Sequence, residues 1–160
     1  MADLQSTHPM PKTPTLPARI EVRSSDIHGT GAFAAKALRR GSFIGCYTGR
    51  RYTADEVAAR EWDHGLTFVF GLSDGSVIDG AEGGNATRHI NHSCAPNCVA
   101  YEIEPEEGDP WIEIEALRPI AAGSELFLDY GLDVWDGDPD AFPCRCGSEG
   151  CRGTLLAAAD

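Results

Sequence analysis

The window from Arg88 to Cys98 carries more polar and reactive side chains than a packed core tolerates. It contains one Arg, two His, two Asn, one Ser and two Cys around a single Ile. Each polar side chain costs roughly 1–3 kcal/mol when it is buried without a partner, so such a segment persists where it binds something or ties chain segments together. We interpret it as the wall of a ligand site. A polar surface loop with two incidental thiols is the alternative.

A second chemical cluster lies near the C-terminus, where Cys144, Cys146 and Cys151 fall within eight residues. Tetrahedral zinc takes four nitrogen or sulfur ligands, so these three thiols lack one partner. Either Cys94 or Cys98 can complete the site and dock the tail against the first window, which would supply folding free energy. Unpaired surface thiols, a disulfide across the tail and a thiol redox site are the alternatives. The redox alternative is the weakest, because this sequence has neither the C-x-x-C spacing nor the βαβ pattern usual for thiol redox proteins.

Several short strands are expected to position these groups. Apolar runs and period-two alternation predict them, with an Asp-Gly turn inside one pair, at Ile20–Val22, Gly41–Gly49, Thr67–Leu72, Val77–Asp79, Val99–Ile103, Trp111–Leu117 and Glu125–Gly131. Tyr47 and Tyr130 then lie near strand ends. With about eight strands and little helix, the predicted class is mainly β, in several small sheets.

Two helical elements and one glycine loop complete the expected layout. The capping-box spacing of Thr53 and Glu56 predicts one packing helix from about Ala54 to Trp62, and Ala86–Ile90 is expected to form a helical turn. Gly29-Thr30-Gly31 lets backbone approach a ligand closely, although a tight hairpin explains the two glycines better when they are taken alone.

Composition limits the function classes. The 160 residues suit one domain, and a net charge of −12 argues against a protein that binds nucleic acid and for a basic partner, unless the acidity only maintains solubility. No stretch is long and apolar enough for a membrane span or a signal peptide, so we expect an intracellular protein, cytoplasmic or nuclear. The proline-rich residues 1–18 are expected to be a disordered arm.

Three segments in the same order resemble one known family. Gly84–Cys94, Glu125–Tyr130 and Cys144–Gly153 are similar to the central motif, the E-L-x-x-D-Y motif and the post-SET motif of SET-domain protein-lysine methyltransferases. The resemblance covers roughly Ile20 to Leu155. It implies a SET-domain fold of small β-sheets, a knot-like meeting of the first two motifs, and a zinc-binding tail. The implied division is an arm at 1–18, a SET domain at 19–131, a linker at 132–143 and the tail at 144–160.

The resemblance also implies roles for individual residues. Tyr130 is the expected catalytic tyrosine, and Tyr47 is expected to line the lysine channel. The expected contacts to S-adenosylmethionine are His28, Gly29, Thr30, Gly31, Arg88, Asn91, His92 and Leu155. The expected zinc ligands are Cys94, Cys144, Cys146 and Cys151. When His28 is considered without the resemblance, a packing or surface role explains it better.

The implied function is transfer of methyl groups from S-adenosylmethionine to lysine in a basic protein or histone-like tail. The alternative is a zinc-stapled module that binds peptides without catalysis. One position departs from the family pattern: Leu128 stands two residues before Tyr130, where Phe or Tyr is usual. Leucine has no hydroxyl to hold a water beside the amine, so we expect room for two or three methylations. A cysteine-rich region before the domain is also absent, so substrate recognition is expected to use the core alone.

Overall fold

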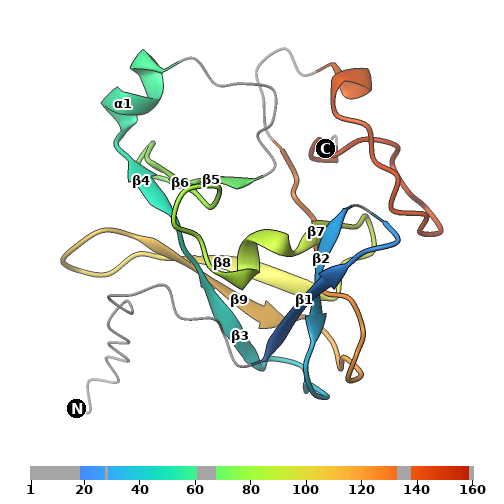
Figure 1. The fold of residues 1–160 in the computed structure, drawn as a ribbon. Helices are drawn as coiled ribbons and strands as arrows, with labels where there is room; N and C mark the ends of the chain where they lie inside the picture. The colour runs from blue at the N-terminus through green and yellow to red at the C-terminus, as the bar shows by residue number, and fades with distance from the viewer. Residues whose placement is uncertain (1–18, 28, 61–67, 133–137, 159–160) are drawn as a thin grey trace, which may run out of the picture.

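The computed structural model describes residues 19–27, 29–60, 68–132 and 138–158. Within these ranges the chain forms ten short strands in four small sheets, with one short α-helix and short 3-10 turns (Figure 1). The mainly β class with several small sheets is therefore confirmed. The expected arm at 1–18 lies outside the described residues.

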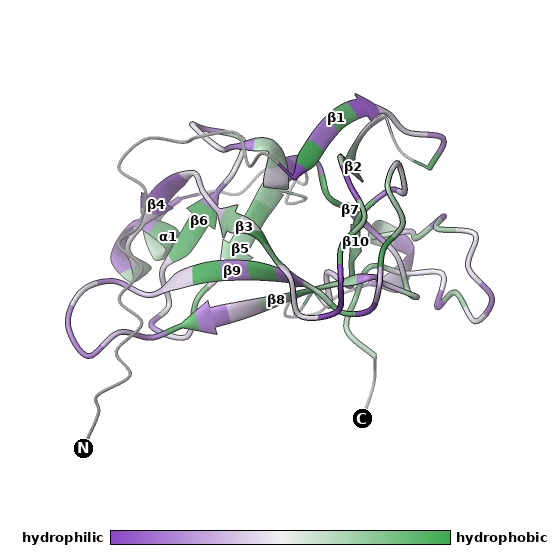
Figure 2. Ribbon diagram, turned by 90° about the horizontal axis from the view of Figure 1, so that it is seen from below, coloured by the Kyte–Doolittle hydropathy of each residue, from purple (hydrophilic) through white to green (hydrophobic). Residues whose placement is uncertain are grey.

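The first sheet is a hairpin of β1 (Ile20–Ser24) and β2 (Thr30–Ala34), paired antiparallel. β1 alternates between apolar and polar residues, which Figure 2 shows as alternating colours. Gly29 closes the loop in the left-handed region, with φ of 42°, and its carbonyl accepts a hydrogen bond of 2.8 Å from the Ser25 amide. The hairpin interpretation of the glycine pair is thus correct for Gly29.

A three-stranded antiparallel sheet forms the centre of the core. Its strands, in spatial order, are β3 (Phe43–Tyr47), β9 (Trp111–Ala116) and β8 (Cys98–Ile103). Ile112 and Ile114 of β9 are buried, and each contributes about 1.5–3 kcal/mol relative to an exposed position. Tyr47 pairs with Ile112. The register therefore places the Tyr47 ring on the buried face of the sheet.

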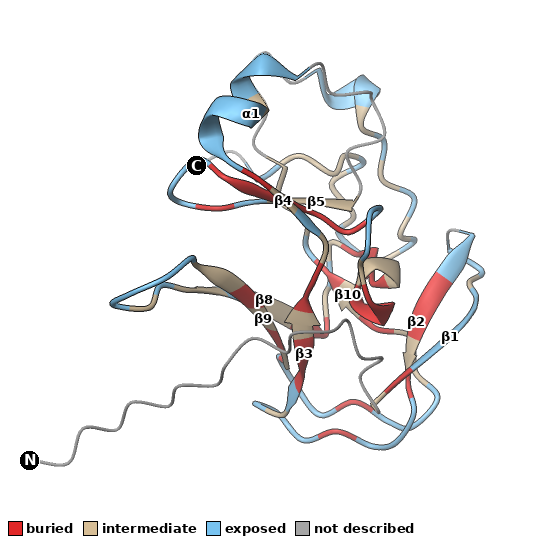
Figure 3. Cartoon of the chain, turned by 60° about the vertical axis from the view of Figure 1, so that its left-hand side comes forward, coloured by how far each residue is buried: buried red, intermediate tan, exposed pale blue. Residues whose placement is uncertain are grey.

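A second three-stranded sheet stands beside it, in the order β4 (Arg50–Tyr52), β6 (Val77–Asp79) and β5 (Val69–Gly71). Helix α1 (Ala54–Ala59) follows β4 and begins with the expected capping box of Thr53 and Glu56. The helix ends at Ala59, before the expected end at Trp62, which lies outside the described residues. None of its residues is buried, and Figure 3 shows most of the helix exposed, with Val57 intermediate, so the expected packing role is weaker than the sequence indicated.

Gly49 connects β3 to β4 where a side chain has no space. A Cβ at this position would lie 2.1 Å from the backbone oxygen of Asp79. We expect Gly49→Ala to lower the melting temperature by about 5 °C or more, because the clash is with backbone and cannot be relieved by a rotamer change. Thermal unfolding followed by circular dichroism checks this. Gly71→Ala is the control, since nothing lies within 4 Å of its Cβ position, and an equal loss in both variants would contradict the explanation.

Two very short strands join distant parts of the chain. β7 (Asn91–His92) and β10 (Phe127–Leu128) pair in parallel, which confirms that the central motif and the Glu125–Tyr130 segment come together. The expected strand at Glu125–Gly131 is shorter than predicted. The helical turn before β7 is confirmed as η2 (Ala86–His89). The β7–β10 pair delivers Asn91, His92 and Tyr130 to one place.

The tail folds back onto the segment that follows Tyr130. The Leu132 amide donates to the Leu155 carbonyl at 3.0 Å, and the Leu155 amide donates to the Phe142 carbonyl at 2.8 Å. Between them lies η3 (Pro139–Ala141). Figure 1 shows this tail, orange to red, returning past β7 and the β1–β2 hairpin. Backbone pairing thus carries Leu155 and the C-terminal cysteines to the central window.

In the part of the chain that the structure describes, no helix has the length and apolar character needed to cross a membrane.

Candidate active site and metal centre

One cavity of about 510 Å³ lies where the β1–β2 loop, η2, β7 and the tail meet. Seven of the predicted site residues line it: Gly29, Thr30, Arg88, Asn91, His92, Tyr130 and Leu155. Two cluster thiols, Cys144 and Cys146, lie in its wall. The structure therefore brings together residues separated by more than a hundred positions in the sequence.

Other predicted residues lie elsewhere. His28 is outside the described residues. Gly31, Tyr47 and Leu128 are not part of the cavity wall, although Tyr47 contacts the wall through Phe68. Leu128 is 3% exposed and belongs to the core cluster, against which Tyr130 packs.

The sequence interpretation did not assign several wall residues to the site: Ile27, Phe68, His89, Pro143 and Arg145. Arg145 lies between Cys144 and Cys146 in the sequence, and this position was the signal that could have assigned it to the site. Together with Arg88 it places two guanidinium groups around the cavity of an otherwise acidic chain. Such a cavity favours a ligand that carries a carboxylate.

Hydrogen bonds hold both the side-chain hydroxyl and the backbone amide of Tyr130. Its hydroxyl donates to the Ile90 carbonyl at 2.7 Å, and its backbone amide donates to Nδ1 of His92 at 3.0 Å. Both partners lie in or next to β7. The parallel β7–β10 pair therefore determines where the phenol oxygen sits.

Tyr47 approaches the same region from the central sheet. Its hydroxyl donates to the Phe68 carbonyl at 2.6 Å, and its ring lies 4.5 Å from that of Phe70. Gly80 makes room for it, because a Cβ there would come within 2.5 Å of the Tyr47 hydroxyl oxygen. Both phenols thus use their hydrogen on a backbone carbonyl and keep oxygen lone pairs available.

The electrostatics keep both phenols protonated. Burial raises the pKa of Tyr130 above its ordinary value. The pKa of Tyr47 is also raised, first by burial and then by the nearby Tyr130 and Asp79. At neutral pH neither tyrosine can act as a general base, in agreement with the hydrogen bonds that each donates.

His92 is a neutral imidazole with a defined tautomer. The Tyr130 amide can only donate, so Nδ1 of His92 is the acceptor and the ring proton is on Nε2. Nε2 faces the Cys94 sulfur at 3.4 Å. Burial lowers the pKa of His92, which favours the same neutral form. Asp129 is 3.7 Å from Nδ1, too far for a hydrogen bond. Both ring nitrogens of His92 already contact protein atoms. His92 could therefore contact a cofactor only through its backbone or its ring carbons.

The cysteine cluster has the dimensions of a tetrahedral metal site. The sulfur atoms of Cys94, Cys144, Cys146 and Cys151 all lie within 4.8 Å of one another. Cys144 is 3.8 Å from Cys94 and 3.7 Å from Cys151. A zinc ion with Zn–S bonds of about 2.3 Å requires sulfurs about 3.8 Å apart, whereas a disulfide requires about 2.05 Å. The spacing fits zinc and excludes the disulfide alternative.

Backbone amides also favour thiolates at this cluster. The amides of Cys146, Arg152 and Gly153 each point at a cluster sulfur at 3.4 Å. Such donors stabilise the anionic sulfur that zinc binds. Cys98, the other candidate for the fourth ligand, is buried elsewhere and its thiol donates to the Asn97 side chain at 3.4 Å. The structure places Cys94, and not Cys98, beside the tail thiols.

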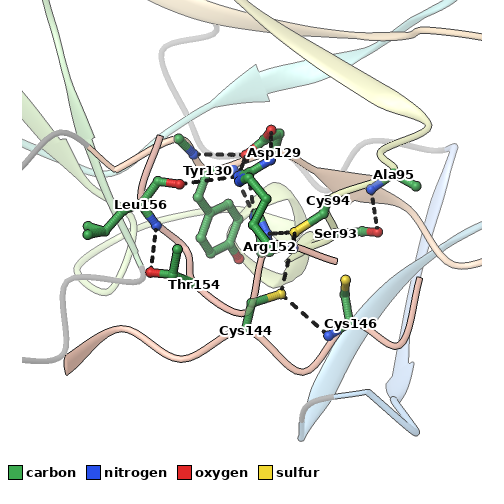
Figure 4. Close-up of polar contacts among 12 residues, drawn as sticks. Ser93, Cys94, Ala95, Asp129, Tyr130, Cys144, Cys146, Arg152, Thr154 and Leu156 are labelled. Atoms are coloured by element: carbon green, nitrogen blue, oxygen red, sulfur yellow. Dashed lines mark hydrogen bonds and ion pairs between the residues drawn. The ribbon is translucent and has the colours of Figure 1, made fainter. Parts of the chain in front are cut away.

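Arg152 connects the cluster to the tyrosine segment, as Figure 4 shows. Its guanidinium makes two hydrogen bonds to the Asp129 carboxylate, at 2.8 and 2.9 Å, while its amide contacts the Cys94 sulfur. Although burial opposes it, the hydrogen bonds and charge of Arg152 lower the pKa of Asp129. This bidentate pair joins the tail to the residue before Tyr130. The sequence interpretation missed it because the two residues are 23 positions apart and neither spacing nor periodicity relates them.

Comparisons with known proteins agree with this arrangement. A family model described as SET domain matches residues 29–131. Over 141 residues the chain is 37% identical to a protein of Neurospora crassa named histone-lysine N-methyltransferase, H3 lysine-4 specific, covering 85% of this chain and 11% of the relative. A protein of the same name from Aspergillus fumigatus is 37% identical over 137 residues, covering 82% and 11%. The histone-lysine N-methyltransferase trithorax of Drosophila virilis is 37% identical over 137 residues, covering 83% and 4%. The chain thus spans about a tenth of these relatives or less.

Proposed function

The chain belongs to the SET-domain family, and from that premise we propose that it is a protein-lysine N-methyltransferase that uses S-adenosylmethionine. The observation that carries the proposal is the single cavity at which the glycine loop, Asn91, His92 and Tyr130 meet. Relatives named as histone-lysine N-methyltransferases support the same reaction type. We also propose the division into a SET domain at 19–131, a linker at 132–143 and a zinc-binding tail at 144–160.

The cavity wall suits the proposed cofactor. Arg88 and Arg145 provide positive charge for a carboxylate, and Asn91 provides an amide for hydrogen bonding. Leu155 supplies an apolar surface from the tail. When bound, S-adenosylmethionine supplies a methyl group carried on a positively charged sulfur. We propose that Gly29, Thr30, Arg88, Asn91, His92 and Leu155 hold it, with His28 and Gly31 acting through the same loop.

The two tyrosines prepare the lysine amine. Lysine has a reference pKa near 10.4 and is neutral in only about one molecule in a thousand at pH 7.4, a cost of roughly 4 kcal/mol. We propose that the lysine side chain enters between Tyr47, which is buried, and Tyr130, which packs against the core, so that loss of water there would lower the pKa of the ammonium. Because each hydroxyl hydrogen is held by a carbonyl, the phenol oxygens are oriented to accept from the amine. Tyr130 orients the reacting groups, and water carries the proton away.

The cysteine cluster is proposed to bind Zn²⁺ as a structural ion through Cys94, Cys144, Cys146 and Cys151. Four thiolates leave no open position for a reactant, as in closed structural sites. Three of these residues belong to the tail and one to the central window. Metal binding therefore stabilises the tail in the place where Leu155 lines the cavity.

Leu128 is expected to permit more than one methylation. Its buried aliphatic side chain offers no hydroxyl to hold a water beside the amine, so space remains for a methylated amine to turn and react again. Mass spectrometry of a methylated peptide should show di- or trimethyl-lysine. A product that stops at one methyl group under excess cofactor would contradict this expectation.

We propose a basic, lysine-containing protein as substrate, because the chain has a net charge of −12 and acidic residues on the β8–β9 hairpin. The two fungal relatives act on lysine 4 of histone H3 according to their names. A histone-like tail or another basic protein in the cytoplasm or nucleus fits this chain equally well. Direct nucleic-acid binding does not fit so acidic a chain.

One experiment tests the reaction directly. The protein is incubated with methyl-labelled S-adenosylmethionine and a mixture of basic proteins, and labelled products are identified by mass spectrometry. Label on lysine supports the proposal. Binding of a basic peptide without binding of S-adenosylhomocysteine and without label would favour the non-catalytic module instead.

A further inference from the structure

Glu125 lies outside the cavity wall, yet its carboxylate joins two elements that form the wall. It precedes β10, and its backbone bridges to Phe33 of β2. The carboxylate oxygen Oε1 accepts a hydrogen bond of 2.7 Å from the Ser25 hydroxyl and one of 3.0 Å from Nδ2 of Asn91. Ser25 begins the loop to Gly29, and Asn91 begins β7. One oxygen atom of Glu125, 100 positions after Ser25 in the sequence, therefore ties the glycine loop to the central window.

The same contacts determine how the Asn91 amide is turned. Nδ2 donates to Oε1 of Glu125 and also to the Thr30 carbonyl at 3.1 Å. Both of these partners are acceptors, so only the nitrogen end of the amide can face them. Without Glu125 one of the two acceptors that select this orientation is lost. The carboxylate and the Thr30 carbonyl therefore together favour the orientation in which the nitrogen end of Asn91 faces them.

Gly31 leaves the space that this carboxylate fills. A Cβ at residue 31 would lie 2.4 Å from Oε1 of Glu125 and 2.9 Å from Cβ of Ser25. Unlike Gly29, Gly31 does not have a positive φ, so its backbone conformation is open to other residues. Gly31 also does not line the cavity. The Glu125 carboxylate, together with Cβ of Ser25, therefore already explains why residue 31 is glycine.

We propose that Glu125 is a positioning residue for the cofactor pocket: it holds the Ser25–Thr30 loop and the Asn91 amide in their binding orientation, and Gly31 admits its carboxylate. This deepens the proposed function and rests on it for the identity of the ligand. The contacts among Ser25, Glu125 and Asn91 do not depend on that identity. Glu125 acts through Asn91 and the loop, without touching the ligand itself.

The test compares Glu125→Ala with Glu125→Gln. Gln keeps an oxygen at the same place that can accept from Ser25 and Asn91, whereas Ala removes it. We expect Glu125→Ala to weaken S-adenosylhomocysteine binding in calorimetry, and to raise the KM for the cofactor, by about tenfold or more. Glu125→Gln should stay within about threefold of the parent. The KM for the peptide should not change in either variant.

A second comparison tests the assignment of Gly31. Gly31→Ala should weaken binding strongly in the parent, because its Cβ meets the carboxylate. In a Glu125→Ala background the same change should cost less, because only the weaker clash with Cβ of Ser25 remains, so the two substitutions should be non-additive. Additive effects would overturn the assignment. So would a Glu125→Gln variant as weak as Glu125→Ala, or a Glu125→Ala variant that melts earlier but binds the cofactor as the parent does.

An NMR measurement separates this proposal from the proposed function. The side-chain amide protons of Asn91 should shift when Glu125 is replaced by Ala, and much less when it is replaced by Gln, with no ligand added. If the parent bound no S-adenosylhomocysteine, the proposed function would fail while the Asn91 signals still reported on the Glu125 contact. Unchanged Asn91 signals in Glu125→Ala would overturn the contact itself.

Discussion

Tyr130→Phe is expected to lower turnover by at least about 100-fold while cofactor affinity stays close to that of the parent. The substitution removes only the hydroxyl, which donates to the Ile90 carbonyl at 2.7 Å and, in the proposed reaction, accepts from the amine. Removing one oriented polar group that acts in the transition state typically costs about 10²–10³ in rate. The Tyr130 ring and its amide contact to His92 remain, so the cavity wall is preserved.

Two measurements resolve this effect. Single-turnover methylation with saturating cofactor gives the chemical rate, and calorimetry with S-adenosylhomocysteine gives the affinity. Tyr101→Phe is the matched control, because Tyr101 is 47% exposed on β8 and outside the cavity wall. A Tyr130→Phe variant with parental turnover would show that the hydroxyl has no part in the reaction. An equal loss in both variants would point to a general effect of losing a phenol.

Removal of the metal is expected to have the second large effect. A strong chelator should release one zinc ion per chain and free the tail, because this short, polar segment buries few apolar side chains of its own. Trypsin should then cleave faster at Arg145 and Arg152, because the amides of Cys146 and Arg152 would no longer be held against cluster sulfurs. Cofactor affinity should fall by about tenfold or more, since Pro143, Cys144, Cys146 and Leu155 all belong to the cavity wall.

Substitution of individual cysteines tests the same zinc site without a chelator. Cys144→Ser should reproduce the loss of zinc and the tryptic sensitivity, whereas Cys46→Ser, outside the cluster, should keep both zinc content and protection. Zinc is measured by mass spectrometry of the metal. A purified protein that contains no zinc, or a tail equally protected with and without chelator, would contradict a structural metal at this cluster.

Sequence patterns predicted the elements that carry a local signal. The capping box at Thr53 placed the start of α1, and the alternation in Trp111–Leu117 placed β9 and its antiparallel partner. The end of the helix was overestimated, because an apolar stripe can be drawn on a helical wheel whether or not a surface exists to bury it. Local patterns report what a segment can form, and tertiary contacts decide how far it extends.

Long-range polar contacts were beyond the reach of such patterns. β7 and β10 contain two residues each, too few for any periodicity, yet their pairing positions Tyr130. The motif resemblance indicated that these segments meet. It did not indicate that Glu125 accepts a hydrogen bond from Asn91 or that Arg152 forms a bidentate ion pair with Asp129. It placed His92 at the cavity, where the residue lies, although it did not indicate that both ring nitrogens face protein atoms. Each of these contacts depends on the three-dimensional register of segments that are remote in sequence.

The fourth thiolate of the cluster comes from Cys94, fifty residues before Cys144. A polypeptide that terminates early, or that a protease clips ahead of Cys151, keeps Asn91, His92 and Tyr130 but cannot assemble the sulfur cage. Such a fragment would also lack Leu155, which lines the cavity from the tail. Completion of the cavity wall therefore depends on residues that follow Tyr130 by more than twenty positions.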